Sequence, residues 1–427
     1  MKHILPIIIT LNLFCTVLIA QNNQSTLKDS LLKEWEKLEL FKKMAQKELP
    51  GFGFYAALIW DGKIISAKKM GYANRETKLP MDENTIFLWG SISKMFTSIA
   101  TIQLIEKGKL RLNDPVVKYI PELGIGTAKY GGMKSIKIHH FLNHNSGLNL
   151  KPCYDSLRAT YPRFKNSIPS TKEMLPFLKL SKQYFKPGTK FRYSNGGYSL
   201  LGIIIERVTK TKFTKYVTRN IFKPLGMKTA HYGVTPKKLS KYFTRAYYRM
   251  KNDAIDTMNF DVSQGFQEGN GGVKATVKDM LKFMDFLKFR QRVNYLKNYE
   301  KVLSRGKLDY YFSEVNVTNP NSNKFSEVLI NKLWEVYRLC GFTYVNSKKV
   351  KSSITGHSGN IAFHTSYFYF NNIMPFGVLL MINVDANDRK AKESRMNSKL
   401  FISIRDFMLI PQFKKRLYTW KKRTIKK

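Results

Sequence analysis

The sequence contains little cysteine, which limits the kinds of fold it can form. Only three cysteines occur in 427 residues, and this excludes a small fold held together by a framework of disulfides. Cys153 and Cys340 remain once an amino-terminal leader is removed, and the sequence leaves open whether these two thiols pair. With 43% hydrophobic residues, a chain of this length can bury a large core without cross-links.

Acidic residues are also scarce, since 73 basic residues face only 30 acidic ones and the formal net charge is +43. Such a field would concentrate the protein at an anionic envelope or membrane surface and attract substrates that carry carboxylates. The densest patch is KKRLYTWKKRTIKK, within a basic tail expected at 411–427. An equally open alternative is a compositional bias toward lysine, with the charge spread over a solvated surface. Nucleic-acid binding is not expected, because the chain contains no recognised nucleic-acid module.

Long apolar runs are absent except at the amino terminus. Lys2 and His3 precede an apolar stretch from Ile4 to Ala20, which polar residues follow. This pattern is typical of a secretory signal peptide at 1–20, and an uncleaved anchor is the alternative. We therefore expect an exported protein that is periplasmic, secreted or held at a membrane by this segment. No other run approaches the about 20 apolar residues needed to span a bilayer.

Signatures of metal and nucleotide chemistry are also missing. His140 and His144 have helical spacing, but the segment HFLNH lacks the glutamate of a zinc-protease motif. The glycine-rich pieces GIGTAKYGG and GNGGVK lack the glycine spacing that cradles phosphates. We therefore expect neither a metal nor a cofactor.

What the sequence does contain is a serine one helical turn ahead of a lysine, in the run GSISKMFT that starts at Gly90. Residues three apart share a helix face, so the Lys94 amine can take the Ser91 proton if burial lowers the pKa of the lysine. The residues that follow are apolar nearly all round, which predicts a buried helix ending near Gly108. In the first turn of a helix, the dipole and the free backbone N–H groups favour a developing negative charge.

The pattern SxxK is not specific by itself, since it also occurs at four other serines, and only Ser91 opens an apolar helix. Two further motifs follow it. Tyr193 and Asn195 precede a Gly-Gly turn that starts another apolar helix, where a loop side chain can point into a cleft. His357 lies in the strand-like segment SITGHSGN, whose small residues can bind a substrate backbone. The structural alternatives are an aromatic that covers the core for Tyr193 and an ordinary strand histidine for His357.

In this order, the three motifs resemble those of the serine β-lactamase and penicillin-binding-protein superfamily, in particular its D,D-peptidase-like, esterase-like and class C β-lactamase-like branch. Three further blocks carry the resemblance, and they are FLNHNSGL (Phe141 to Leu148), FKPLGMKTAHY (Phe222 to Tyr232) and GNGGVKATVKDMLKF (Gly269 to Phe283). Together the landmarks run from about residue 50 to 410. The first block favours a structural role for His140 and His144 over metal binding.

The resemblance implies a role for each catalytic group. Ser91 would be the nucleophile, Lys94 its base, and Tyr193 the group that moves protons to the leaving group or from the deacylating water. The backbone N–H groups of Ser91 and Asn360 would form the oxyanion hole. Acyl transfer requires a nucleophile, a base and donors aimed at the tetrahedral oxygen, so the set is chemically complete.

The resemblance also implies a substrate-binding set, made up of Asn195, His357, Ser358 and Gly359. His357, Ser358 and Gly359 stand where many family members have Lys-Thr-Gly, and His-x-Gly is the form found in many of its peptidases and esterases. The missing lysine argues against a dedicated β-lactamase, because that cation commonly helps to hold the antibiotic carboxylate.

The expected fold is α+β with three α/β/α layers, an antiparallel sheet flanked by helices, as in β-lactamases and transpeptidases. The pattern predicts an N-terminal helix at 21–49, then a catalytic domain at 50–410 with an inserted helical lobe at about 110–290. A hairpin with the turn Asp61-Gly62 starts the sheet.

These observations predict an exported serine hydrolase that forms an acyl-enzyme on Ser91 and cleaves an amide or ester bond. The substrate would be a small molecule or a peptide, with a D-amino-acid or cell-wall-type peptide as the first candidate. Two alternatives stay open: an esterase or weak β-lactamase of the same fold, and a catalytically inactive basic protein that binds the envelope. The sequence does not determine the oligomeric state.

Overall fold

The computed structural model describes most of the chain, and the ranges are 25–38, 53–125, 129–165, 167–249, 255–288, 296–304, 306, 328–330, 333–338, 341–345, 353–371, 374–384 and 407–408. The expected signal peptide, the basic tail and Cys340 lie outside these ranges. Cys153 is buried as a free thiol. None of the helices in the described ranges is long and apolar enough to cross a membrane.

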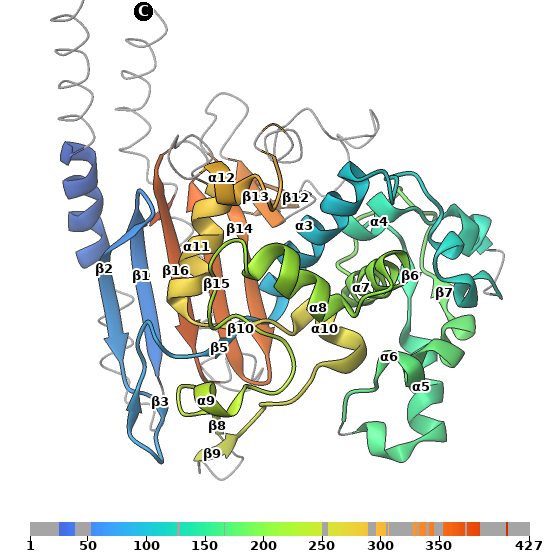
Figure 1. Ribbon diagram of the computed structural model, residues 1–427, viewed down its shortest axis with the longest axis horizontal. Helices are drawn as coiled ribbons and strands as arrows, with labels where there is room; N and C mark the ends of the chain where they lie inside the picture. The colour runs from blue at the N-terminus through green and yellow to red at the C-terminus, as the bar shows by residue number, and fades with distance from the viewer. Residues whose placement is uncertain are drawn as a thin grey trace, which may run out of the picture.

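The centre of the fold is an antiparallel sheet with the strand order β11-β12-β13-β14-β15-β16-β1-β2 (Figure 1). Its strands are β1 (Phe54–Trp60), β2 (Lys63–Met70), β11 (Val328–Ile330), β12 (Leu333–Arg338), β13 (Gly341–Val345), β14 (Ser353–Ile361), β15 (His364–Asn371) and β16 (Phe376–Ile382). Asp61 and Gly62 both have positive φ, at 53° and 75°, and form the predicted hairpin turn between β1 and β2. β1 also pairs with β16, so the sheet joins the two ends of the domain.

Strand β1 shows why the sheet is covered on both faces. Tyr55, Ala57 and Ile59 pack in a core with the helices of one layer, whereas the alternate residues of β1 pack in a second core with Leu31 and Trp35. Successive side chains of a strand point to opposite faces, so two apolar layers require an apolar residue at every position. The expected three-layer α+β fold is confirmed.

One layer contains the helix at residues 25–36, and the other contains α3 (Ser93–Glu106) and α11 (Val277–Lys288). Beyond α3 lies a largely helical lobe (Figure 1). Its elements are α4 (Ile138–Leu142), α5 (Lys151–Thr160), α6 (Thr171–Met174), α7 (Asn195–Thr209), α8 (Phe213–Val217) and α10 (Glu268–Gly271), with the two-stranded sheet of β6 (Leu148–Asn149) and β7 (Lys182–Gln183). Helix α9 (Lys237–Ser240) and the hairpin of β8 (Ala246–Arg249) and β9 (Ile255–Met258) lie instead at one end of the large sheet (Figure 1). The remaining short elements are β3 (Tyr72–Asn74), β4 (Leu79–Pro80), β5 (Phe87–Leu88), β10 (Lys274–Ala275) and α12 (Leu296–Tyr299).

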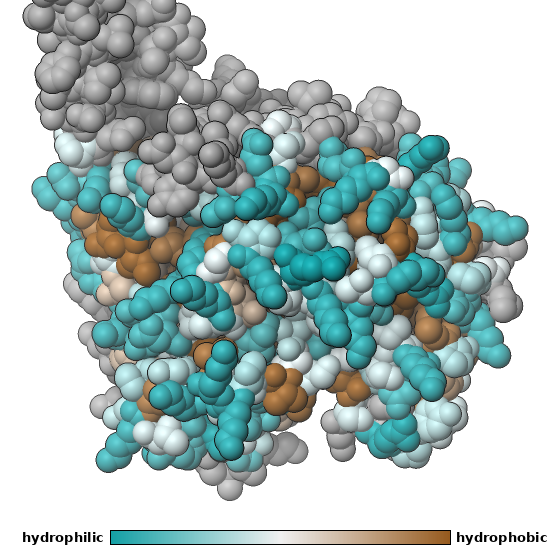
Figure 2. All heavy atoms as spheres, in the orientation of Figure 1, coloured by the Kyte–Doolittle hydropathy of each residue, from teal (hydrophilic) through white to brown (hydrophobic). Residues whose placement is uncertain are grey.

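Local signals place the two helices that carry the site. Helix α3 ends at Glu106, and Gly108 follows with φ +67°, which is the predicted stop. Helix α7 starts where the Ser194 side chain accepts a hydrogen bond from Gly197 N, and it stops at Lys210 in the left-handed region. Hydrophilic side chains cover most of the visible face of both lobes, with apolar side chains in scattered patches (Figure 2).

Candidate active site

Ser91 lies in a tight turn that leads directly into α3. The turn is the 3₁₀ segment Gly90–Ile92, so α3 begins at Ser93, two residues later than Ser91. Lys94 Nζ lies 2.9 Å from Ser91 Oγ, within hydrogen-bond distance, and donates a second hydrogen bond to the Asn270 carbonyl at 2.8 Å. The predicted serine–lysine pair is therefore formed.

The environment of Lys94 is closed to solvent and short of negative charge. Its side chain is fully buried, and no carboxylate forms a salt bridge with it in the described ranges. Burial lowers the pKa of Lys94 well below its usual value, because a buried ammonium loses its hydration. An unprotonated amine beside a serine hydroxyl can accept the hydroxyl proton.

The Tyr193 ring lies beside the Ser91–Lys94 pair, and Tyr193 precedes the start of α7 by two residues. Its ring centroid lies 5.0 Å from Lys94 Nζ, and its hydroxyl is hydrogen-bonded to the Ser91 side chain. Burial raises the pKa of the phenol above its usual value, and the bond to Ser91 opposes that rise only in part. The phenol therefore keeps its proton at neutral pH, although 36% of the side chain remains exposed.

His144 fixes the backbone on both sides of Tyr193. The backbone N–H of Ser194 donates to His144 Nδ1 at 3.0 Å, and that of Arg192 donates to the His144 carbonyl at 2.8 Å. The two rings of His144 and Tyr193 lie 4.3 Å apart between centroids. The sequence indicated only a structural role for His144, and its link to the second motif comes from two chain segments that meet only in the folded protein.

The third motif, His357 to Gly359, lies on β14 and packs against the turn that contains Ser91. A Cβ built on Gly359 would lie 2.0 Å from the Trp89 carbonyl, and one on Gly90 would lie 3.0 Å from Asn360 N. Both positions therefore require glycine, and the second shows that the Asn360 backbone N–H lies beside the Gly90 turn. Ser366 Oγ on β15 donates to the same Trp89 carbonyl at 3.0 Å.

His357 is the buried member of the third motif. Its Nδ1 donates to the Ser358 carbonyl at 2.5 Å, and its ring lies 6.0 Å from that of Tyr193. Burial, with the nearby Lys94 as a second cause, lowers the pKa of His357 to about 3. The imidazole is therefore neutral at physiological pH and does not supply the positive charge that a lysine would bring to this position.

The other predicted site residues lie beside this cluster. Asn195 is exposed at the first position of α7, where it lines a cavity of about 450 Å³. Ser358 is half-buried between His357 and Gly359. Direct contacts thus join Ser91, Lys94, Tyr193 and His357. Asn195 and Ser358 lie beside this cluster because they are close to Tyr193 and His357 in the sequence.

The sequence analysis missed Asn270, whose carbonyl accepts the Lys94 amine. Its side chain donates to Ser199 Oγ at 2.7 Å, and the preceding carbonyl of Gly269 accepts from Thr97 Oγ1 at 2.6 Å. These bonds hold α10 against α3 and α7. A backbone carbonyl has no residue-type signature, so no sequence pattern identifies this contact.

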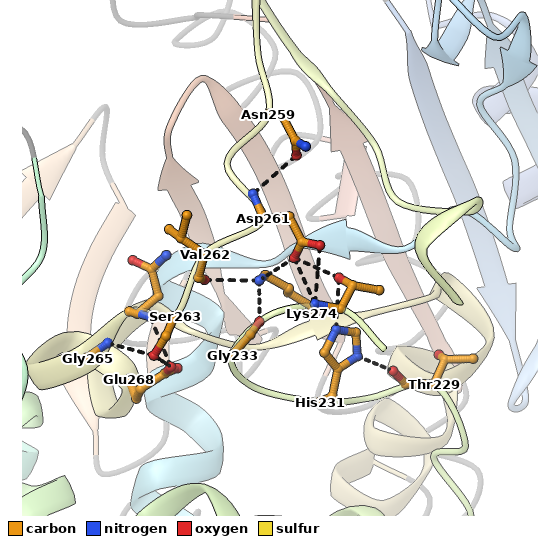
Figure 3. Close-up of polar contacts among 12 residues, drawn as sticks. Thr229, His231, Gly233, Asn259, Asp261, Val262, Ser263, Gly265, Glu268 and Lys274 are labelled. Carbon is orange, nitrogen blue, oxygen red and sulfur yellow. Dashed lines mark hydrogen bonds and ion pairs between the residues drawn. The ribbon is translucent and has the colours of Figure 1, made fainter. Parts of the chain in front are cut away.

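A buried network of charges holds the chain on either side of α10 (Figure 3). Lys274 Nζ lies 2.8 Å from Asp261 Oδ1 and donates to the carbonyls of Gly233 and Val262. Burial lowers the pKa of Lys274, and Asp261 opposes that shift. On the other side, Glu268 Oε1 accepts from the Gln264 backbone N–H at 2.9 Å. The network fixes the loops that present the Asn270 carbonyl to Lys94.

No group of three or more His, Cys, Asp or Glu side chains is placed to hold a metal ion in the part of the chain that the structure describes.

Comparison with known proteins gives a consistent result over most of the chain. The family model described as Beta-lactamase matches residues 40–400. A penicillin-binding protein of Bacillus subtilis is 29% identical over 304 residues, which is 67% of this chain and 64% of the relative. The matched region spans 61% and 64% of the lengths of two curated relatives from that organism.

Two solved structures share the fold. The octameric penicillin-binding protein homologue from Pyrococcus abyssi superimposes with a TM-score of 0.64 and 27% identity, over 82% of this chain and 73% of that one. The D-amino acid amidase from Ochrobactrum anthropi gives a TM-score of 0.60 at 22% identity, over 84% of this chain and 92% of that one.

Proposed function

This chain belongs to the beta-lactamase family, and on that premise we propose that it is a serine hydrolase that forms an acyl-enzyme on Ser91. The observation that carries the proposal is the 2.9 Å contact between Ser91 Oγ and a fully buried Lys94 amine. A lysine deprived of hydration and of a carboxylate partner is a base at neutral pH, and a base in contact with a hydroxyl makes it a nucleophile.

Acylation would proceed in three proton transfers. Lys94 Nζ takes the hydroxyl proton as Ser91 Oγ bonds to the substrate carbonyl carbon, and the carbonyl π electrons move to the oxygen. The backbone N–H groups of Ser91 and Asn360 would stabilise this oxyanion. When the intermediate collapses, the bond to the leaving group breaks and the leaving group takes a proton from Tyr193, which Lys94 then reprotonates.

Tyr193 suits this step because its phenol is neutral and close to both reacting partners. It is hydrogen-bonded to Ser91, and Lys94 Nζ lies 5.0 Å from its ring. In deacylation the same groups would act in reverse, with the tyrosine and lysine taking the proton of the attacking water. Water then replaces Ser91 on the acyl carbon, the bond to Ser91 Oγ breaks as this oxygen takes the proton back, and the acid is released.

The first candidate substrate is an amide of the D-amino-acid or cell-wall peptide type. Similarity to a penicillin-binding protein and the fold shared with a D-amino acid amidase support this class. Asn195, His357, Ser358 and Gly359 would bind the peptide beside Ser91. Because His357 is neutral, the site lacks a cation at that position for an antibiotic carboxylate, so an esterase is the second candidate and a dedicated β-lactamase is disfavoured.

Export is the second part of the proposal. The lysine-led apolar run at 1–20 and the net charge of +43 support a protein delivered to an anionic envelope or membrane surface. The mature protein should bind vesicles that contain phosphatidylglycerol at low salt and be released as salt rises. Binding that is indifferent to salt would contradict an electrostatic attachment.

The first experiment is intact-mass spectrometry after treatment with a fluorophosphonate and, separately, with a fluorescent penicillin. We expect each adduct to appear on the native protein and to be absent from Ser91→Ala. Circular dichroism of the variant controls for folding. If neither probe adds mass to the folded native protein, the chain does not use Ser91 as a nucleophile, and an inactive envelope-binding protein becomes the better description.

A further inference from the structure

A basic, aromatic cavity lies next to the Ser91 cluster. Its volume is about 450 Å³, which is in the size range of small-ligand sites. Tyr193, Asn195 and Asn270 form the side that it shares with the cluster, whereas α5, β6 and Tyr184 lie among the other parts of its lining. A substrate bound at Ser91 can therefore extend into this cavity.

The charged side chains that line the cavity leave it with a net positive charge. Lys151, Arg158 and Arg192 line it together with a single acidic residue, Asp155. Lys151 Nζ lies 2.5 Å from Asp155 Oδ2, so this lysine and the aspartate neutralise each other. Within the described ranges no carboxylate forms a salt bridge with Arg158 or Arg192. Two guanidinium charges are left unbalanced.

Aromatic rings hold both guanidinium groups in place. Arg192 Cζ lies 3.9 Å from the centroid of Tyr184, and Arg158 Cζ lies 5.7 Å from that of Tyr154. A guanidinium stacked on a ring keeps its N–H groups in its own plane, where they can donate to a carboxylate, and it loses less side-chain entropy on binding. Arg192 is further restrained because its backbone N–H is bonded to His144.

We propose that this cavity binds a carboxylate on the substrate, so that Arg158 and Arg192 select acidic acyl or peptide groups for the reaction at Ser91. The proposal rests on the proposed hydrolase function for its consequence in catalysis, but the binding itself does not require turnover. A carboxylate fits the planar donor fork of arginine with two parallel hydrogen bonds, whereas a neutral amide of the same shape gains only one good acceptor.

The test compares two probes that differ only in charge. Glutaryl and glutaramoyl conjugates of one neutral fluorophore are titrated into Ser91→Ala, which cannot turn them over, at about 150 mM salt so that long-range attraction is screened. We expect the glutaryl probe to bind at least about tenfold more tightly, the difference made by one charge-assisted contact. In Ser91→Ala with Arg192→Gln or Arg158→Gln, this preference should fall below about threefold.

Arg111→Gln is the matched control, because it removes the same charge from an exposed residue that does not line the cavity. It should leave the preference unchanged. Equal binding of the two probes would show that the cavity does not recognise the carboxylate. An equal loss of preference in Arg111→Gln would show that only the general positive field of the protein attracts the anion. Either result would overturn the proposal. Failure of the hydrolase function appears separately, as absent fluorophosphonate labelling of the native serine.

Discussion

His144 Nδ1 accepts a hydrogen bond from the backbone N–H of Ser194 at 3.0 Å. The bond joins the segment before β6 to the segment before α7, and it places a fully buried imidazole against the ring of Tyr193. Because Nδ1 is the acceptor, the ring proton of neutral His144 resides on Nε2. Burial, with Lys94 and then His357 as further causes, lowers the pKa of His144 well below its usual value and keeps it neutral.

Replacement of His144 should therefore affect the reaction through Tyr193. Asparagine can place an oxygen where Nδ1 accepts, and it tolerates the left-handed backbone of this position, where φ is +53°. We expect His144→Asn to keep the kcat for an ester substrate within about threefold, and His144→Ala to lower it by about tenfold or more, since the lost bond and a misplaced Tyr193 both raise the barrier.

His144→Gln provides the matched control, because its longer side chain carries the acceptor away from the Nδ1 position. It should behave like His144→Ala. If all three variants lose the same activity while their melting temperatures also fall equally, His144 contributes only to stability. A loss confined to KM would likewise contradict a role in positioning Tyr193.

Lys94 should give the reaction a characteristic pH dependence. Burial lowers the pKa of Lys94, and the amine is a base only when it is unprotonated. The rate of fluorophosphonate labelling should therefore rise with pH and reach a plateau well below the ordinary lysine pKa of about 10.4. Lys94→Arg should slow labelling by about a thousandfold, because a guanidinium stays protonated at all of these pH values. A rate that climbs steadily to pH 10 would contradict this assignment.

Buried histidines should make the protein sensitive to acid. Burial, as the largest cause, lowers the pKa of His140 and His357 to about 3 and that of His364 to about 4. Below the unfolded value of about 6.5 the unfolded state binds more protons than the folded state, so the free energy of unfolding falls as pH falls. Each group contributes at most about 1.4 kcal/mol per pH unit.

The urea midpoint should thus decrease steadily between pH 7 and pH 5. His364→Asn, whose amide can still donate to the Ala362 carbonyl that His364 contacts at 3.0 Å, should show a shallower decrease because one titrating group is gone. A midpoint that does not change over this range would mean that the histidines titrate as they do in water.

Alanine substitutions at Gly90 and Gly108 distinguish the effect of backbone strain from the effect of a changed site geometry. Both have positive φ, at +53° and +67°, so an alanine at either position costs about 1–2 kcal/mol of stability. Only a Cβ at Gly90 would approach Asn360 N, whereas a Cβ at Gly108 meets nothing within 4 Å. We expect Gly90→Ala to slow Ser91 labelling by about tenfold or more and Gly108→Ala to leave the rate unchanged, as measured at a temperature where both variants are folded.

The parts of the fold that short-range physics controls could be predicted from the sequence. The Asp61-Gly62 turn, the stop at Gly108 and the continuous apolar run of β1 are local patterns. The sequence analysis did not predict β11 and β12, because each is short and acquires its hydrogen bonds only from neighbouring strands. It also placed Ser91 inside the helix, whereas the close approach of Asn360 to Gly90 accompanies a tighter turn ahead of α3.

The sequence by itself determined the contact between Ser91 and Lys94, because the two residues are three apart on one turn and need no other part of the chain to meet. Only the tertiary structure decided what that pair can do. The Asn270 carbonyl that holds Lys94 lies 176 positions away in the sequence, and the burial that lowers the pKa of the amine is produced by helices that pack around α3. Spacing along a helix is fixed by its geometry, whereas desolvation depends on every segment packed around the group.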